Sequence, residues 1–159
     1  MKLRWLALAF ALLTPALHAA GLRATVTYVN DGDTLWVRPV RGGPRLELRL
    51  LGIDAPERCQ AFGAEARQAL RQRVLYQPVE VRLRGRDAYN RHLGHVRRGG
   101  EDIAAWMVRH GYAWSSTYKG RRGPYAKLEA QARRRHAGLW RAAHPMEPRR
   151  FRQRFGPCR

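Results

Sequence analysis

Residues 23–53 read RATVTYVNDGDTLWVRPVRGGPRLELRLLGI, and this stretch decides the fold. Apolar and β-branched residues alternate with polar ones in three segments, as is typical of β-strands that bury one face. Glycine-containing turn signals separate these segments, at NDGD and at RGGP. The sequence therefore predicts three successive strands, at residues 23–30, 34–40 and 45–53.

Further along the chain, apolar residues recur at helical spacing in three segments and alternate in two. Helices are predicted at residues 63–76, 101–110 and 124–137, and strands at 78–84 and 93–97. This order of elements predicts an α+β fold, a five-stranded Greek-key β-barrel of the OB-fold type with three α-helices. The domain is expected to span residues 21–142, and the Pro- and Arg-rich tail, residues 143–159, is expected to lack regular structure.

The chain is strongly basic, with 31 Lys and Arg against 12 Asp and Glu and a net charge of +19. Only three of the basic residues are lysines, and arginine is the side chain best suited to bidentate phosphate contacts. The composition indicates a polyanionic partner, which can be nucleic acid, an anionic membrane surface or a sulfated polysaccharide. Genome base composition can also raise the arginine count, so charge alone does not identify the partner.

Residues 1–20 have the layout of a secretory signal peptide, in which Lys2 and Arg4 precede an apolar run and small residues follow at Ala19 and Ala20. The run is too short to span a bilayer comfortably, although an uncleaved membrane anchor is the alternative. Cleavage would remove Lys2 and Arg4 and lower the net charge from +19 to +17. We expect a periplasmic or secreted protein without stable membrane association after cleavage.

The two cysteines, Cys59 and Cys158, both lie in the mature part of the chain. An even number of cysteines in an exported protein suggests one disulfide, and two free thiols are the alternative. A bridge would tie the C-terminal tail to the segment just after Glu57.

Four of the 12 acids are Asp31, Asp33, Asp54 and Glu57. A hairpin that turns at Gly42 and Gly43 would place Asp33 opposite roughly position 52, and therefore near Asp54. Carboxylates that gather in this way repel one another unless a cation or hydrogen bonds offset the charge. Hard oxygen ligands suit Ca²⁺ or Mg²⁺, but Asp-Gly-Asp is also an ordinary turn.

Three motifs follow one another along the chain, and a late helical segment completes them. They are VNDGDTLWV at residues 29–37, LRLLGIDAPE at 48–57, DAYNRHLGHV at 87–96 and EAQARRRHAGLW at 129–140. On these motifs the chain, from Thr25 to Trp140, resembles the staphylococcal nuclease (thermonuclease) family. The resemblance implies a Ca²⁺-dependent nuclease that hydrolyses DNA and RNA phosphodiester bonds at the 5′-oxygen and leaves 3′-phosphate ends.

The resemblance also implies roles for particular residues. Asp33 and Asp54 match the carboxylate ligands of Ca²⁺, and Ala55 matches the residue whose backbone carbonyl binds the metal. Asp31 matches an acid that acts through the water shell of the metal. Glu57 matches the residue usually assigned as the general base for the attacking water.

Arg49 and Arg91 match the two arginines that hold the scissile phosphate. Two guanidinium groups and a cation would supply countercharge to a pentacoordinate transition state. Tyr89, Tyr118 and Lys119 are the implied substrate contacts. The implied partner is DNA or RNA, preferably single-stranded, bound by a monomer.

Two other functions are weighed against this one. A non-catalytic nucleic-acid-binding OB module usually lacks the acids or arginines, which are all present here. A basic protein that binds cell-envelope polyanions would need none of the acids. His92 and His95 are interpreted as strand or surface residues, because no cysteine or acid completes a zinc pattern. Phe151 and Phe155 either contact nucleic acid or dock the tail onto the barrel.

Overall fold

The computed structural model describes residues 21–117 and 120–158, which form a five-stranded barrel with helices on one side of it. The barrel strands lie in the order β3-β2-β1-β5-β6, and parallel pairing of β3 with β6 closes the barrel. Their bounds are β1 Leu22–Val29, β2 Thr34–Pro39, β3 Leu46–Leu50, β5 Pro78–Arg86 and β6 His92–Arg98. The predicted five-stranded barrel is confirmed.

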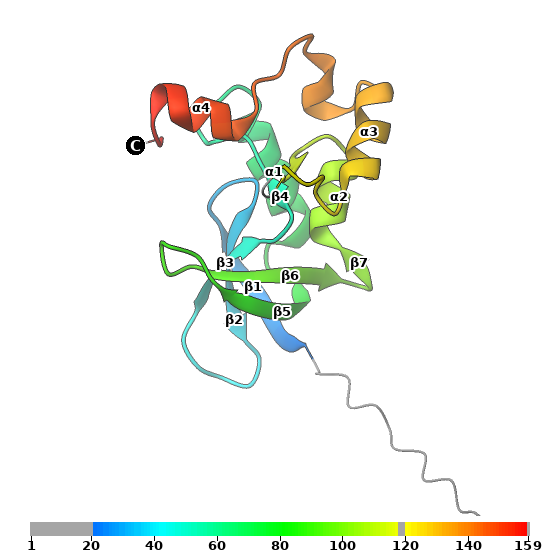
Figure 1. Cartoon of the computed structure of the whole chain (residues 1–159). Coiled ribbons are helices and arrows are strands. Elements are labelled where there is room, and N and C mark those ends of the chain that lie inside the picture. Colours follow the sequence, from blue (N-terminus) through cyan, green and yellow to red (C-terminus); the bar gives the residue numbers. More distant parts are fainter. Residues whose placement is uncertain (1–20, 118–119, 159) are drawn as a thin grey trace, which may run out of the picture.

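Three short strands and the helices complete the described part of the chain. Strands β4 and β8 pair with each other, and β7 extends the barrel sheet beside β6. The bounds are β4 Ile53–Asp54, β7 Glu101–Asp102, β8 Trp114–Ser115, α1 Gly63–Val74, α2 Ile103–Arg109, α3 Ala126–Arg134 and α4 Pro148–Phe155, with a 3₁₀ turn at Gly138–Arg141. In Figure 1 the barrel strands fill the lower half, the helices lie above them, and α4 is on the opposite side from α3.

The barrel interior is built from the alternating apolar residues of its strands. Leu48 and Leu50 of β3 are almost completely buried, and Leu70 of α1 packs in the same cluster. Burying one such side chain stabilises the fold by about 1.5–3 kcal/mol relative to leaving it exposed. Arg49 lies between the two leucines in sequence and therefore points to the opposite face of β3.

The β2–β3 hairpin has a different register from the predicted one. The Gly42 amide donates to the Pro39 carbonyl at 3.2 Å, so a turn over residues 39–42 starts the reversal and the hairpin is centred one residue earlier than predicted. Asp33 consequently lies opposite Leu50, whose amide donates to the Asp33 carbonyl at 2.8 Å, and not opposite position 52. This two-residue shift places Arg49 of β3 beside Asp33.

All three predicted helices are shorter than predicted, and α1 ends at Val74 instead of residue 76. Residues 101–102 belong to β7, and Asp102 caps α2 by accepting a hydrogen bond from the Ala105 amide at 3.0 Å. Aspartate at this position satisfies a helix amide that has no partner within the helix, so the helix begins after it. Helix α3 begins at Ala126 and ends at Arg134, inside the predicted range 124–137.

The expectation of a tail without regular structure is wrong, because residues 148–155 form α4. Pro148 occupies the first turn of this helix, where its missing N–H costs nothing and its fixed φ is already helical. The Phe151 amide donates to the Glu147 carbonyl at 3.0 Å to start the helix. The proline that suggested an irregular tail therefore starts a helix. Three α-helices were predicted, and the described residues form four.

A second apolar cluster lies outside the barrel and joins α3 to the segment that precedes α4. It contains Trp114, Leu139 and Trp140, with the two tryptophan rings edge to face at 5.1 Å. Trp106 and Tyr112 pack against the barrel core instead. Among the described residues, no helix is both long enough and apolar enough to cross a membrane.

Candidate active site

The turn between β1 and β2 is organised by Asp31. One oxygen of its carboxylate accepts hydrogen bonds from the amides of Asp33 and Thr34, at 3.0 and 2.7 Å. Aspartate side chains commonly stabilise turns in this way. The turn also packs closely on the segment after β4, since a Cβ at Gly32 would lie 2.6 Å from that of Ala55. The Asp-Gly-Asp sequence thus aims Asp33 at the Ala55 backbone.

Arg49 brings Asp33 and Asp54 together. Its guanidinium forms an ion pair with Asp33 and a second one with Asp54, whose oxygen lies 3.0 Å away. The Ala55 amide donates to the other Asp33 oxygen at 2.9 Å. The two aspartates therefore converge as predicted.

Asp33 is the most enclosed acid of the site, with 3% of its surface exposed. Burial raises the pKa of Asp33 from 3.8 to about 7, since desolvation of the carboxylate outweighs the attraction of Arg49. Burial alone would lower the pKa of Arg49, but the charges of Asp33 and Asp54 outweigh it and raise that pKa. Arg49 is therefore a fixed positive charge between two acids.

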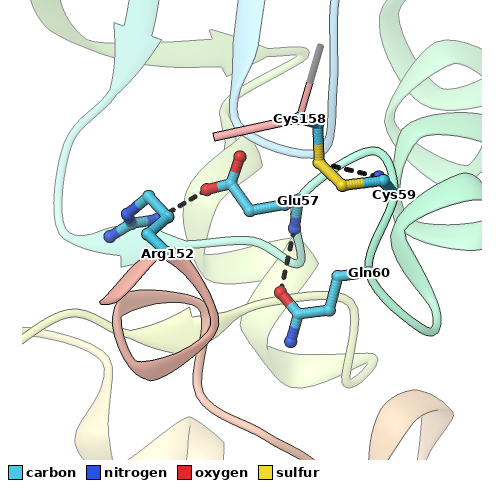
Figure 2. Close-up of a disulfide and its surroundings, with 5 residues drawn as sticks. All are labelled: Glu57, Cys59, Gln60, Arg152 and Cys158. Carbon is cyan, nitrogen blue, oxygen red and sulfur yellow. Dashed lines mark hydrogen bonds and ion pairs between the residues drawn. A yellow bond between two sulfur atoms is a disulfide. The ribbon is translucent and has the colours of Figure 1, made fainter. Parts of the chain in front are cut away.

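Glu57 lies in the loop between β4 and α1, and its backbone is tightly held. Its amide donates to the Gln60 side-chain oxygen at 3.1 Å, as Figure 2 shows. A Cβ at Gly63 would come within 1.9 Å of the Glu57 carbonyl oxygen, so only glycine permits α1 to begin here. The Glu57 carboxylate accepts a hydrogen bond from Arg152 of α4 at 2.7 Å (Figure 2).

Arg91 is positioned by the turn that joins β5 to β6. The Asp87 carboxylate accepts from Arg91 Nε at 2.8 Å, and these contacts lower the pKa of Asp87 although burial alone would raise it. The Tyr89 ring centroid lies 5.4 Å from the Arg91 guanidinium, and 82% of Tyr89 is exposed. Asn90 has a φ of 63°, the left-handed conformation that asparagine tolerates better than most residues.

These residues surround one cleft of about 580 Å³. Its lining comprises Asp31, Asp33, Glu47, Arg49, Ala55, Pro56, Glu57, Tyr89, Arg91, Arg152 and Pro157. Asp54 lines an adjoining hollow together with Arg49 and Arg152. The structure thus gathers the sequence-predicted residues in one place, while Tyr118 and Lys119 lie outside the described residues.

Sequence reasoning missed Arg152, which joins the site from 95 positions beyond Glu57. Burial alone would lower the pKa of Arg152, but hydrogen bonds with Asp54 and Glu57 outweigh it and raise that pKa. The signal that could have identified an arginine from the tail is the cysteine pair. Cys59 and Cys158 form a disulfide with their Cα atoms 5.7 Å apart, which confirms the predicted bridge and places the tail beside Glu57 (Figure 2).

Asp33 and Asp54 bring carboxylate oxygens together at this site, and such hard oxygens are the donors that divalent cations of the Ca²⁺ type prefer. The carboxylates of Asp33 and Asp54 face guanidinium groups, so both already point toward positive charge, and Ala55 adjoins them. Within residues 21–117 and 120–158, no three acidic, histidine or cysteine side chains enclose a metal by themselves. Ca²⁺ accepts such a mixture of carboxylates, backbone carbonyls and water. His92 and His95 lie on β6, as expected of strand residues.

Comparison with known proteins relates the chain to nucleases. Residues 47–142 match the sequence model of the family described as "Staphylococcal nuclease homologue". The chain is 39% identical to Protein ParB of Escherichia coli over 92% of this chain and 89% of that protein. It is 36% identical to a micrococcal nuclease of Shigella flexneri, over 95% and 92% of the two chains. An uncharacterized endonuclease of Haemophilus influenzae is 33% identical, over 80% and 71%.

Proposed function

Since the chain belongs to the staphylococcal nuclease family, we propose that it is a Ca²⁺-dependent nuclease that hydrolyses phosphodiester bonds of DNA and RNA. The observation that carries this proposal is the convergence of Arg49, Arg91 and Glu57 on the cleft that also holds Asp33. Hydrolysis needs such proximity, because the attacking water must lie close to its proton acceptor and to the two cations that bind the phosphate. A module that only binds nucleic acid would not need a carboxylate cluster in its basic cleft.

Arg49 and Arg91 bind the scissile phosphate. Each guanidinium presents several N–H donors, and each is held by an acid, Arg49 by Asp33 and Arg91 by Asp87. Donors fixed before the reaction need no reorganisation when negative charge accumulates on the phosphoryl oxygens. Arg91 also donates to the departing 5′-oxygen, which carries the electron pair of the broken bond.

Glu57 accepts a proton from the attacking water. The water oxygen forms a bond to phosphorus as the bond to the 5′-oxygen breaks, and the 5′-oxygen later takes a proton from solvent. The phosphate then remains on the 3′-oxygen of the upstream nucleotide. The close packing of Gly63 on the Glu57 carbonyl holds the backbone from which this carboxylate extends.

Asp33, Asp54 and the Ala55 carbonyl would hold Ca²⁺, and Asp31 would interact with the water molecules that surround the cation. When bound, the cation supplies countercharge to the phosphate and acidifies the water beside it. The convergence of the Asp33 and Asp54 carboxylates beside Ala55 supports this assignment. Residue 55 would bind the cation only through its backbone carbonyl, so an alanine serves as well as any other residue at this position.

Single-stranded nucleic acid is the substrate form that the cleft favours. Tyr89 presents an exposed ring next to Arg91, and such rings stack on bases that a duplex would keep covered. We further propose that residues 1–20 direct export and that the mature protein works as a monomer. The disulfide supports export, because such bridges persist in oxidising compartments.

Analysis of product ends tests the proposed chemistry. Purified mature protein is incubated with Ca²⁺ and an end-labelled single-stranded DNA or RNA, and the fragments are measured by mass spectrometry. We expect fragments with 3′-phosphate and 5′-hydroxyl ends, and Glu57→Ala should slow their formation by at least about 100-fold. Products with 5′-phosphate ends would overturn the assigned direction of cleavage, and binding without any fragment would favour the non-catalytic module.

A further inference from the structure

Arg152 forms hydrogen bonds with two carboxylates on which the proposed function depends, those of Asp54 and Glu57. Its Nη1 donates to Asp54 at 3.1 Å and to Glu57 at 2.7 Å, and its Nη2 donates to the second Asp54 oxygen at 3.0 Å. Both oxygens of Asp54 are therefore engaged by the same guanidinium. Bidentate pairs between arginine and carboxylate are among the stronger protein hydrogen bonds. Figure 2 shows Arg152 reaching Glu57 from α4.

Two contacts fix α4 in this position. The Gln60 side-chain amide donates to the Met146 carbonyl just before the helix. The half-buried Phe151 ring faces an apolar cavity that Gln60 and Phe62 also line. The Cys59–Cys158 disulfide anchors the chain beyond the helix, two residues from Glu57 and six from Arg152.

We infer that Arg152, which the C-terminal tail supplies, acts as a gate of the metal site. In this role Arg152 competes with a divalent cation for the carboxylates of Asp54 and Glu57. This inference rests on the proposed Ca²⁺ site. A cation that binds Asp54 would meet the positive charge of Arg152, which engages both oxygens of Asp54, and this repulsion opposes simultaneous binding. The same guanidinium engages Glu57, so one displacement frees both the metal ligand and the proton acceptor.

Arg152 belongs to the same chain as these acids, so the competition is intramolecular, and the disulfide keeps the tail beside them. A tethered group meets its site at an effective concentration in the millimolar range, whereas a free arginine side chain would not compete appreciably. If the gate is closed in about nine molecules of ten, the apparent Ca²⁺ affinity falls about tenfold, in proportion to the open fraction. Removing Arg152 should therefore strengthen Ca²⁺ binding, whereas damage to a merely structural residue would weaken it.

Calorimetric titration of Ca²⁺ into the folded protein, without nucleic acid, tests the gate. The variants are Arg152→Ala, Arg152→Lys and, as a matched control on the same helix, Arg150→Ala. Arg150 is exposed, and its replacement removes the same charge at a distance from the acids. We expect Arg152→Ala to lower the Kd for Ca²⁺ about tenfold, Arg150→Ala to change it less than twofold, and lysine to give an intermediate value.

The inference is overturned if Arg152→Ala binds Ca²⁺ no more tightly than Arg150→Ala does. If Arg152→Ala loses its native circular dichroism spectrum, Arg152→Lys decides, and a Kd equal to that of the wild type overturns the gate. Failure of the proposed function looks different: no protein in the series would bind Ca²⁺, and the wild type would cleave no DNA in its presence. Cys158→Ser provides the tether test, since releasing the tail should also lower the Kd.

Discussion

Replacing Arg49 by lysine separates the charge of this residue from its geometry. Arg49 uses two different nitrogens to contact two different acids, Asp33 through Nη1 and Asp54 through Nη2. A lysine ammonium keeps the charge but has a single nitrogen, which cannot span both positions. In the phosphate complex the same limitation should remove one of the two donors directed at the transition state.

The expected loss follows from that missing donor. Removing one preorganised donor from a transition-state anion costs about 100- to 1000-fold in rate, or about 3–4 kcal/mol. Arg49→Ala should lose more, about 10⁴-fold, because both donors and the charge disappear. Alanine also leaves the buried Asp33 without its cation, which should destabilise the fold by about 3–5 kcal/mol.

Single-turnover cleavage of a fluorescent single-stranded oligonucleotide at saturating Ca²⁺ gives the rates, and urea unfolding gives the stabilities. Arg45→Lys is a matched control, because Arg45 is exposed and precedes the same strand. It should leave both quantities unchanged. A cleavage rate for Arg49→Lys within fivefold of the wild-type rate would refute the view that Arg49 acts through two positioned donors.

Three further variants test the structure around the site. Tyr125→Phe removes the hydrogen bond from the Tyr125 hydroxyl to Asp102 at 3.0 Å and should lower the free energy of unfolding by about 1–2 kcal/mol in urea titrations at pH 8. Burial, followed by the charge of Asp102, raises the pKa of Tyr125 above its usual value of 10 in the folded protein. Between pH 10 and 12 the tyrosine therefore ionises first in the unfolded chain, and the stability difference between wild type and Tyr125→Phe should shrink. Gly63→Ala should reduce the cleavage rate more than tenfold, because its methyl group would displace Glu57, and an unchanged rate would contradict that packing. Cys158→Ser opens a link between residues 99 positions apart and should cost at most about 4–5 kcal/mol of unfolding free energy, measured against the wild type under the same conditions.

The sequence was sufficient to predict the barrel, because alternation along β1 to β3 and the turn residues between them encode local structure. The register of β2 and β3 could not be predicted from the glycine pair. The chain reverses earlier, where the Gly42 amide reaches the Pro39 carbonyl, and that choice depends on how β2 packs in the closed barrel. Local patterns therefore give the strands, and tertiary packing gives their alignment.

The candidate site likewise contains residues that local sequence motifs identify and one residue that only long-range contacts place there. Asp33, Arg49 and Glu57 are recognisable because they lie in motifs of fixed spacing, and the fold brings them into one cleft. Arg152 carries no such motif and is one arginine among many in the tail. Its position follows from a disulfide and from the hydrogen bond between Gln60 and Met146, which are long-range contacts that no local pattern encodes.

The most direct test is the rate at which the purified mature protein cleaves single-stranded DNA with Ca²⁺ and with a chelator, beside Asp54→Asn. Asparagine keeps the size of the side chain and removes the charge that would hold the cation. We predict rapid cleavage by the wild type with Ca²⁺, none with the chelator, and a loss of at least about 100-fold for Asp54→Asn. Cleavage by the wild type that persists unchanged in the chelator would contradict a Ca²⁺-dependent nuclease.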